Sequence, residues 1–306
     1  MNDLESFAFK SPLSDELPEI LIPYAHELLK IKGIACFGKA RRNELCYCDR
    51  SPKTWCENDE SHILCTPDVE QELERKCPQA IRIVLDDARA CFIDLTRRLL
   101  ESQRIEVTAL IPRSFGVSSL ARIGTGTQID SEARIDEEVF IGSNCIIQRG
   151  VWLRHGVKIG DGAMIGATGI NAYVSRDGRQ LDFPHLAGVI IEEGVHIGAN
   201  SVVMRGLLTS TRIGSLTTIG NLCNIGHGAR LGKRCWMSVG CLIGGHTEMG
   251  EGATLGMGCV IRDNLKIGEN TQIGMGSVVV KHVTAGISVF GNPARPVPTI
   301  TAGPER

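Results

Sequence analysis

The chain has 306 residues and a nearly balanced charge, with 33 Lys and Arg against 35 Asp and Glu and a net charge of -2. This balance excludes a bulk electrostatic attraction to nucleic acid or to an anionic membrane. The N-terminal segment carries acids where a secretory signal needs a basic start, and no segment approaches the roughly 20 apolar residues that span a bilayer. We therefore expect a cytoplasmic protein without integral membrane association.

The chain contains 12 cysteines, which are scattered along its length. A chain of this size does not need disulfide staples, so we expect most of the cysteines to be small buried hydrophobic residues. Cys46, Cys48 and Cys56 lie close together in sequence, but their spacing fits no common zinc-binding pattern. The sequence therefore predicts no metal site.

Residues 1–110 form the first predicted domain, of the α/β class. Apolar runs at 63–65 and 81–85 have the composition of buried strands. The segment 87–100 predicts an amphipathic helix, because its apolar residues recur at helical spacing: Ala88, Cys91, Phe92, Leu95 and Leu99. A small α/β domain thus precedes the rest of the chain.

Residues 111–285 follow a six-residue period. An aliphatic residue returns at every sixth position in three runs: Ile123, Ile129, Ile135, Ile141, Ile147, Leu153, Ile159 and Ile165; Ile191, Ile197 and Val203; and Ile213, Ile219, Ile225, Leu231, Met237, Ile243, Met249, Leu255, Ile261, Ile267, Ile273 and Val279. Fixed periods are typical of repeat folds in which each unit stacks on the next. Aliphatic residues that point into a narrow core, with small residues at the corners, predict a parallel β-helix.

Three hexapeptides make one triangular coil of 18 residues. A residue eighteen positions further along the chain is then expected on the same face, one coil higher and about 4.8 Å away, as in any parallel sheet. This rule predicts which residues distant in sequence are neighbours in space.

Two segments interrupt the period. Residues 170–188 predict a loop that leaves the prism, and long loops of this kind are often functional. Residues 204–211 shift the phase by four positions, which predicts a smaller bulge. Residues 286–306 are expected to form a C-terminal tail without a helix.

The order of these parts resembles the UDP-3-O-acylglucosamine N-acyltransferases of lipid A synthesis. The resemblance covers roughly residues 30–300 and is carried by the segments LCYCDRSPKTW, ILCTP, VLDDARACFIDLTRRL, GVIIEEGVHIGAN, NLCNIGHGARLG and GNPARP. It implies a mainly β fold, with a left-handed parallel β-helix preceded by a small α/β domain, and a homotrimer with substrate sites between neighbouring prisms. It also implies transfer of an acyl group from a thioester to the amine of a nucleotide-activated amino sugar, with no tightly bound cofactor.

Three features depart from that family's pattern. Met204 stands where the family has an acidic residue, and Asn264 stands where it has a second histidine. After residues 291–295 the sequence continues with prolines in place of the carrier-binding helices of the family. We therefore expect acyl-CoA as the donor, with acyl carrier protein as the alternative, and Lys281 and Arg295 as ligands of the coenzyme phosphates.

His227 is the predicted general base. It follows the inward Ile225 by two positions, between two glycines, and the pKa range of histidine suits proton transfer near neutrality. The eighteen-residue rule places Gly245 one coil above it, where a backbone N–H can bind the oxyanion of the transfer, as the resemblance also implies. A histidine packed at a subunit seam and a glycine at a structural corner are the non-catalytic alternatives.

The candidate substrate-binding residues come from both domains. The resemblance implies that the nucleobase stacks on an aromatic residue of the first domain, either Tyr47 or Trp55, and a core aromatic is the alternative. His246 is expected to line the cleft of the second domain. Asn224 and His185 complete the set.

Other protein classes share such a prism. A γ-type carbonic anhydrase needs three zinc-binding histidines, and the position five residues after His227 is Gly232, which argues against that class. A non-catalytic assembly protein is the alternative outside the enzymes, and a sugar O-acyltransferase is the nearest enzymatic rival.

Overall fold

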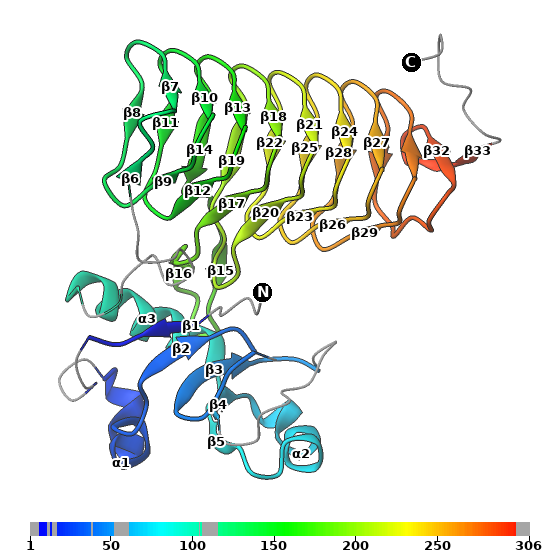
Figure 1. Cartoon of the computed structure of the whole chain (residues 1–306). Coiled ribbons are helices and arrows are strands. Elements are labelled where there is room, and N and C mark those ends of the chain that lie inside the picture. Colours follow the sequence, from blue (N-terminus) through cyan, green and yellow to red (C-terminus); the bar gives the residue numbers. More distant parts are fainter. Residues whose placement is uncertain are drawn as a thin grey trace, which may run out of the picture. The chain divides into compact units, whose positions relative to one another are not determined.

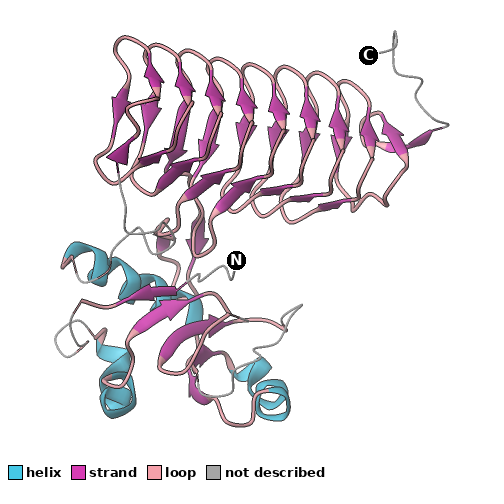
Figure 2. Ribbon diagram, viewed as in Figure 1, coloured by secondary structure: helices cyan, strands magenta, loops and turns pink. Residues whose placement is uncertain are grey.

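In a computed structural model of the protein, the described residues are 6–10, 13, 17–37, 39–51, 61–103, 105 and 116–297. The chain divides into two compact units, of which the first comprises residues 1–110 and 170–186 and the second residues 111–169 and 187–306. The described helices all lie in the first unit, and the described part of the second unit consists of strands and turns (Figure 2). None of these helices is long and apolar enough to cross a membrane.

The first unit contains a five-stranded sheet whose strands lie in chain order (Figure 1). Its first pair is antiparallel and the other neighbours are parallel. The strands are β1 (Ser6–Ala8), β2 (Gly33–Ala35), β3 (Glu44–Cys48), β4 (His62–Cys65) and β5 (Ile81–Val84), and the helices are η1 (Glu19–Tyr24), α1 (Ala25–Leu28), α2 (Pro67–Lys76) and α3 (Ala88–Glu101). The predicted strands at 63–65 and 81–85 are confirmed as β4 and β5.

Helix α3 confirms the predicted amphipathic helix. Asp87 caps its N-terminus by accepting a hydrogen bond of 2.9 Å from the backbone N–H of Ala90. The apolar residues at helical spacing are all buried: Ala88, Cys91, Phe92, Leu95 and Leu99. Packing of this apolar stripe against the sheet supplies most of the stability of such a helix.

Residues 170–186 belong to the first unit, although they interrupt the repeats of the second unit in sequence. They contain the antiparallel strands β15 (Ala172–Val174) and β16 (Gln180–Asp182). The Tyr173 hydroxyl donates a hydrogen bond of 2.9 Å to Asp87, and Arg179 donates one of 3.0 Å to Asp94 of α3. The segment predicted as a loop is therefore a hairpin that contacts helix α3.

The second unit is a three-sided parallel β-helix (Figure 1), which confirms the predicted fold class. The chain passes in turn through three sheets, here called sheets 1, 2 and 3. Sheet 1 contains β6 (Gly116–Val117), β9 (Arg134–Ile135), β12 (Val151–Leu153), β17 (Val189–Ile191), β20 (Thr211–Ile213), β23 (Arg230–Leu231), β26 (Glu248–Met249) and β29 (Lys266–Ile267). Sheet 2 contains β7 (Arg122–Ile123), β10 (Phe140–Ile141), β13 (Lys158–Ile159), β18 (His196–Ile197), β21 (Thr218–Ile219), β24 (Trp236–Met237), β27 (Thr254–Leu255), β30 (Gln272–Ile273), β32 (Ser288–Phe290) and β33 (Arg295–Val297). Sheet 3 contains β8 (Gln128–Ile129), β11 (Ile146–Ile147), β14 (Met164–Ala167), β19 (Val202–Met204), β22 (Asn224–Ile225), β25 (Leu242–Ile243), β28 (Val260–Ile261) and β31 (Val278–Val279).

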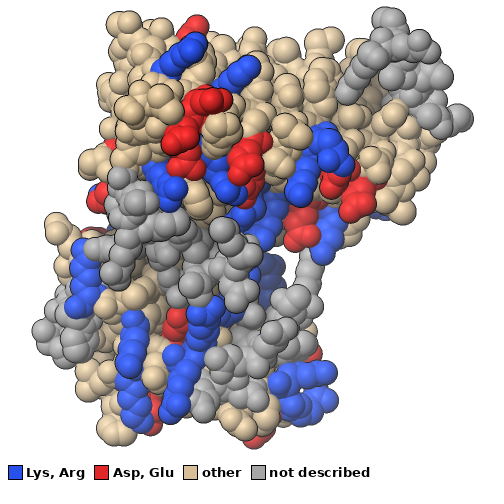
Figure 3. Space-filling view, in the orientation of Figure 1, with Lys and Arg blue, Asp and Glu red and all other residues tan. Residues whose placement is uncertain are grey.

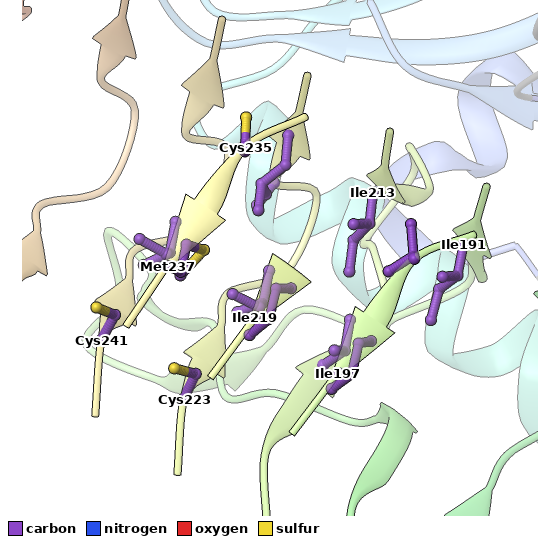
Figure 4. Packing of buried hydrophobic residues seen from close by; sticks show 14 of the residues in the cluster. Ile191, Ile197, Ile213, Ile219, Cys223, Cys235, Met237 and Cys241 are labelled. Atoms are coloured by element: carbon purple, nitrogen blue, oxygen red, sulfur yellow. The ribbon is translucent and has the colours of Figure 1, made fainter. Parts of the chain in front are cut away.

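The predicted register is confirmed where the period is unbroken, as the pairing of Ile225 with Ile243 shows. The inward aliphatic residues face one another in the centre of the prism (Figure 4). Ile123 departs from the prediction, with 40% of its surface exposed, because the first coil has a packing neighbour on one side only. Burial of these inward aliphatic residues, which form a single apolar column, drives the folding of the β-helix.

Charged side chains on and beside sheet 1 pair across successive coils. Glu192 accepts hydrogen bonds from Arg154 at 2.6 Å and from Arg212 at 2.8 Å. Lys266 lies 3.3 Å from Glu248. Basic and acidic side chains lie next to one another on the visible face of the prism (Figure 3). Exposed pairs of this kind contribute little stability, but they neutralise the face.

Five cysteines lie inside the prism, each two positions before an inward aliphatic residue: Cys145, Cys223, Cys235, Cys241 and Cys259. Each thiol donates a hydrogen bond to the carbonyl oxygen of a turn residue fifteen positions later, and for Cys241 this acceptor is Gly256 at 3.2 Å. Thr127 and Thr217 occupy the same repeat position and donate to the same kind of carbonyl. The expectation of a packing role is thus incomplete, because these cysteines also act as small hydrogen-bond donors.

The C-terminal residues differ from the predicted tail. Strand β32 continues sheet 2 in parallel with β30, and β33 runs back antiparallel to β32. Val289 of β32 is buried as part of the apolar column. Regular structure therefore extends to residue 297, because the last coil covers its open end with this strand.

We predict that Cys241→Ala lowers the free energy of unfolding by about 1 kcal/mol, because it leaves the turn carbonyl of Gly256 without its donor. Cys241→Ser keeps a donor at the same position and is expected to lose less. Urea denaturation followed by circular dichroism measures both changes. Equal losses in the two variants would show that the sulfur contributes only by packing.

Candidate active site

The predicted base lies at the corner where the chain passes from sheet 3 to sheet 1. Five successive coils place a residue there, two positions after the inward aliphatic residue of sheet 3. We call this set the His227 column: Arg205, His227, Gly245, Asp263 and Lys281. Because the strands of sheet 3 pair in register, the members of the column follow one another at the spacing of a parallel sheet, about 4.8 Å per coil.

The imidazole of His227 packs against the backbone of Gly245, one coil above it. A methyl group built on Gly245 would lie 2.6 Å from both Cε1 and Nε2 of the ring. The absence of a side chain at Gly245 therefore creates the space in which the ring lies. The eighteen-residue rule predicted this neighbour correctly.

His246 makes the reciprocal contact with the coil below. Its ring occupies the space over Gly228, where a methyl group would lie 2.6 Å from Nδ1 and 2.7 Å from Cε1 of the imidazole. The His227 and His246 rings meet edge to face, with 4.9 Å between their centroids and 79° between their planes. Each histidine thus fills the space that a glycine of the other coil leaves open.

The backbone of His246 has a φ of 53°, a left-handed conformation that residues with a side chain rarely adopt. The same repeat position is glycine in the coil below, at Gly228, and asparagine in the coil above, at Asn264, both with positive φ. A strained residue is often kept where its side chain has a function. Leu216, Leu222 and Arg234 adopt the same conformation at the equivalent repeat position, so the positive φ belongs to the corner and does not single out His246.

Burial lowers the pKa of His227, and the negative charge of Asp263 partly offsets that effect. A lowered pKa keeps the imidazole neutral at neutral pH, which is the form that accepts a proton. Its own charge state therefore suits a general base.

The backbone N–H of Gly245 is directed to no acceptor within the described part of the chain. In other coils a side chain from the next coil accepts from the N–H at the equivalent repeat position: Asp161 accepts from Ser143 at 2.7 Å, and Asn221 accepts from Ala199 at 2.9 Å. At Gly245, as at the equivalent positions Lys233 and Glu251, no described group accepts from this N–H, and at Gly245 the donor lies next to the imidazole.

Arg205 lies below His227 in the column, and sequence reasoning did not select it. Its guanidinium is buried and donates to backbone carbonyls, to Gly166 at 3.1 Å and to Arg149. Burial lowers its pKa to about 10. The phase shift at 204–211 is the sequence signal that could have identified Arg205, because it marks a break in the repeat next to the predicted base.

The bulge at 204–211 is tied to the turn that carries the base. The Thr211 hydroxyl donates to the carbonyl of Met204 at 2.7 Å and accepts from the N–H of Gly228 at 2.8 Å. Thr211 is fully buried. The bulge therefore holds the His227 turn in place.

Asn224 lies on β22, three residues before His227, and is half-buried. It is the polar exception on the outer positions of sheet 3 from β11 to β31, where the other residues are Ile146, Met164, Val202, Leu242, Val260 and Val278. Its carboxamide is thus a polar group on an apolar face next to the base, which suits the predicted contact with a substrate.

In the first unit, Tyr47 is part of an aromatic cluster. Its ring centroid lies 5.0 Å from that of Phe92 and 6.0 Å from that of Phe183. Burial raises the pKa of the Tyr47 hydroxyl to about 12. This packing agrees with the core alternative for Tyr47, and its partial exposure leaves the stacking role as a prediction.

The remaining predicted site residues are dispersed. His185 is 8% exposed and belongs to the first unit, and Trp55 lies outside the described residues. Lys281 follows sheet 3 as the last member of the His227 column, whereas Arg295 is on β33 of sheet 2. The two predicted phosphate ligands therefore do not share a sheet.

The predicted absence of a metal was based on the spacing of Cys46, Cys48 and Cys56. Cys46 and Cys48 are buried on β3, and Cys56 lies outside the described residues. Across the described ranges, no group of three His, Cys, Asp or Glu residues has an arrangement that would hold a metal ion.

Comparison with known proteins gives matches along the second unit. The family described as bacterial transferase hexapeptide (six repeats) matches residues 246–281, and the hexapeptide repeat of succinyl-transferase matches residues 132–170 and 188–221. The UDP-N-acetylglucosamine acyltransferase of Campylobacter jejuni has the same fold, with a TM-score of 0.51 and 20% identity over 61% of this chain and 73% of that chain.

Curated relatives match a shorter segment. The UDP-3-O-acylglucosamine N-acyltransferase of Caulobacter vibrioides is 42% identical over 77 residues, which are 25% of this chain and 22% of that protein. The protein of the same name from Synechococcus elongatus is 39% identical over 77 residues, which are 25% of this chain and 21% of that protein. The match thus spans about a fifth of the length of these relatives.

The fold and its repeats define the class: the chain contains hexapeptide repeats that form a parallel β-helix. Across a quarter of the chain, the sequence is similar to the UDP-3-O-acylglucosamine N-acyltransferases named above.

We predict that Gly245→Ala displaces the His227 ring without unfolding the prism. The backbone of Gly245 does not need a positive φ, but the new methyl group would overlap the imidazole. NMR of the histidine Cε1–H signals, with circular dichroism as the folding check, measures the displacement. Lys233→Ala is the matched control, because it places alanine at the same repeat position of another corner. An unshifted His227 signal in folded Gly245→Ala would contradict the packing described above.

Proposed function

We propose that the protein is an acyltransferase that moves an acyl group from a thioester to the amine of a nucleotide-linked amino sugar. The observation that carries the proposal is the pairing of a histidine of lowered pKa with an adjacent backbone N–H that the described fold leaves unused. Acyl transfer needs both groups, a base for the attacking amine and a donor for the oxyanion.

In the proposed reaction the nitrogen lone pair of the acceptor forms the new C–N bond, and the carbonyl π electrons move to the oxygen. The Gly245 N–H stabilises that oxyanion, while His227 accepts the proton that the nitrogen loses. When the intermediate collapses, the C–S bond breaks and the protonated His227 returns its proton to the thiolate, which leaves as the thiol. No tightly bound cofactor is needed, since the thioester is a co-substrate.

The names of the relatives support the acceptor. Those named above are UDP-3-O-acylglucosamine N-acyltransferases, and their printed name specifies a nucleotide-linked sugar and a nitrogen acceptor. The donor in our proposal is acyl-CoA, with Lys281 at the end of the His227 column as a candidate phosphate ligand. Acyl carrier protein as the donor, and a sugar hydroxyl as the acceptor, are the two alternatives.

We expect a homotrimer. Four exposed apolar residues follow one another on successive coils at the corner between sheets 2 and 3, and we call them the apolar ridge: Leu222, 60% exposed; Val239, 42%; Met257, 54%; and Met275, 61%. Contiguous apolar surface of this kind marks protein contacts, and most soluble oligomers have closed symmetry. The ridge is a surface that a second copy of the chain would cover.

The decisive experiment incubates the protein with acyl-CoA and acyl carrier protein thioesters of equal chain length and with UDP- and dTDP-linked amino sugars, and measures thiol release. We predict that His227→Ala lowers turnover by about 100-fold, because general-base assistance typically contributes that much. His196→Ala, an exposed histidine on β18, is the matched control and should keep full activity. Near-normal turnover in folded His227→Ala would refute the base, and a wild-type protein that acylates no amino sugar would refute the proposed function.

We predict that Met257→Glu dissociates the trimer, because a carboxylate on the apolar ridge would have to be buried without a partner. Light scattering after size-exclusion chromatography measures the mass. Ile170→Glu changes an 81% exposed residue of the first unit and is the control, which should leave the mass unchanged. A Met257→Glu protein of unchanged trimeric mass would show that the ridge lies outside the interface.

A further inference from the structure

Asp263 is a member of the His227 column that the mechanism above does not use. It lies one coil above Gly245, as Gly245 lies one coil above His227, because β22, β25 and β28 pair in register. The proposed base, the proposed oxyanion donor and a carboxylate therefore follow one another in a straight line at one corner.

The His227 ring and the Asp263 carboxylate are separated by a position without a side chain. The edge of the His227 ring lies 2.6 Å from the position that a Cβ atom of Gly245 would take. Asp263 stands one coil above Gly245, so roughly one coil spacing, about 4.8 Å, separates the ring edge from the level of Asp263. The negative charge of Asp263 also acts on His227. A single nitrogen atom placed between the two groups would be within hydrogen-bond reach of both.

Several acids of the prism pair with a cationic side chain, and Asp263 differs from them within the described residues. Glu192 pairs with Arg154 and Arg212, and Glu251 pairs with Arg234. Within the part of the chain that the structure describes, no ion pair involves Asp263. Its described contact is with the neighbouring Asn264, whose Nδ2 donates to Oδ2 at 2.5 Å and orients the carboxylate.

We propose that Asp263 binds the amino group of the acceptor and makes the site select amines over hydroxyls. The inference rests on the proposed function and names the residue that sets its acceptor class. When an amine attacks the thioester, the intermediate has a positive nitrogen and a negative oxygen. The carboxylate stabilises the nitrogen until His227 removes its proton, and the Gly245 N–H stabilises the oxygen.

A hydroxyl acceptor would gain nothing from this carboxylate. Its oxygen is uncharged before the attack, and His227 removes its proton as the C–O bond forms, so no stable cationic oxygen develops for the carboxylate to stabilise. The charge of Asp263 therefore favours the amine over the hydroxyl when the acceptor binds and again when the intermediate forms.

The test compares two acceptors, a nucleotide-linked amino sugar and its analogue with a hydroxyl in place of the amine, at saturating acyl-CoA. Asp263→Asn should lower kcat/KM for the amine by about 10- to 100-fold, the range of a charge-assisted hydrogen bond, and leave the hydroxyl analogue and the acyl-CoA KM unchanged. Asp263→Glu should restore part of the amine activity. Glu269→Gln removes a carboxylate at the same repeat position of the next corner and should change neither acceptor.

Calorimetry provides a second reading that does not depend on turnover. The wild-type protein should bind the amino-sugar nucleotide more tightly than the hydroxyl analogue, and Asp263→Asn should remove that difference. Unchanged amine kinetics in folded Asp263→Asn, or equal losses for both acceptors, would overturn the assignment while the acyltransferase proposal stands. A wild-type protein that transfers acyl groups to no amine and binds both nucleotides equally would overturn both.

Discussion

The structure depends on one constraint, the in-register hydrogen bonding of each coil to the coil eighteen residues before it. An inward aliphatic residue at every sixth position supplies the apolar column, and the backbone ladder fixes how the coils stack. As a consequence, each position of the repeat becomes a straight column of neighbours. A residue can acquire a partner one coil away without any change to the rest of the fold.

The proposed chemistry is a direct use of such a column. At the corner between sheets 3 and 1 the repeat places His227 next to a glycine, and the missing side chain at Gly245 makes room for the ring and leaves an N–H beside it. Asp263 follows in the next coil. The proposed base, the proposed oxyanion donor and a carboxylate thus occupy three adjacent levels, an order that would suit the charges that develop when an amine attacks a thioester.

The same geometry explains features that are unrelated to catalysis. Cys241 and its equivalents donate to turn carbonyls because their repeat position faces the turn of the next coil at the same corner, and Thr127 and Thr217 do the same. The break at 204–211 is tolerated because the Thr211 hydroxyl donates to the carbonyl of Met204 within the break and accepts from the N–H of Gly228 in the His227 turn. The repeat therefore accommodates donors and bulges as long as the backbone ladder continues.

The sequence by itself determined the β-helix, its register and the pairing of His227 with Gly245, because all three follow from a short period that is repeated along the chain. Tertiary structure decided what depends on contacts between unrelated segments. It showed the hairpin at 170–186 bound to α3, Tyr47 among Phe92 and Phe183, and the buried Arg205 below the base. It also showed that the His227 and His246 rings interlock over two glycines. A period specifies where a residue stands on the coil, but the direction of its side chain and its pKa depend on the packing around it.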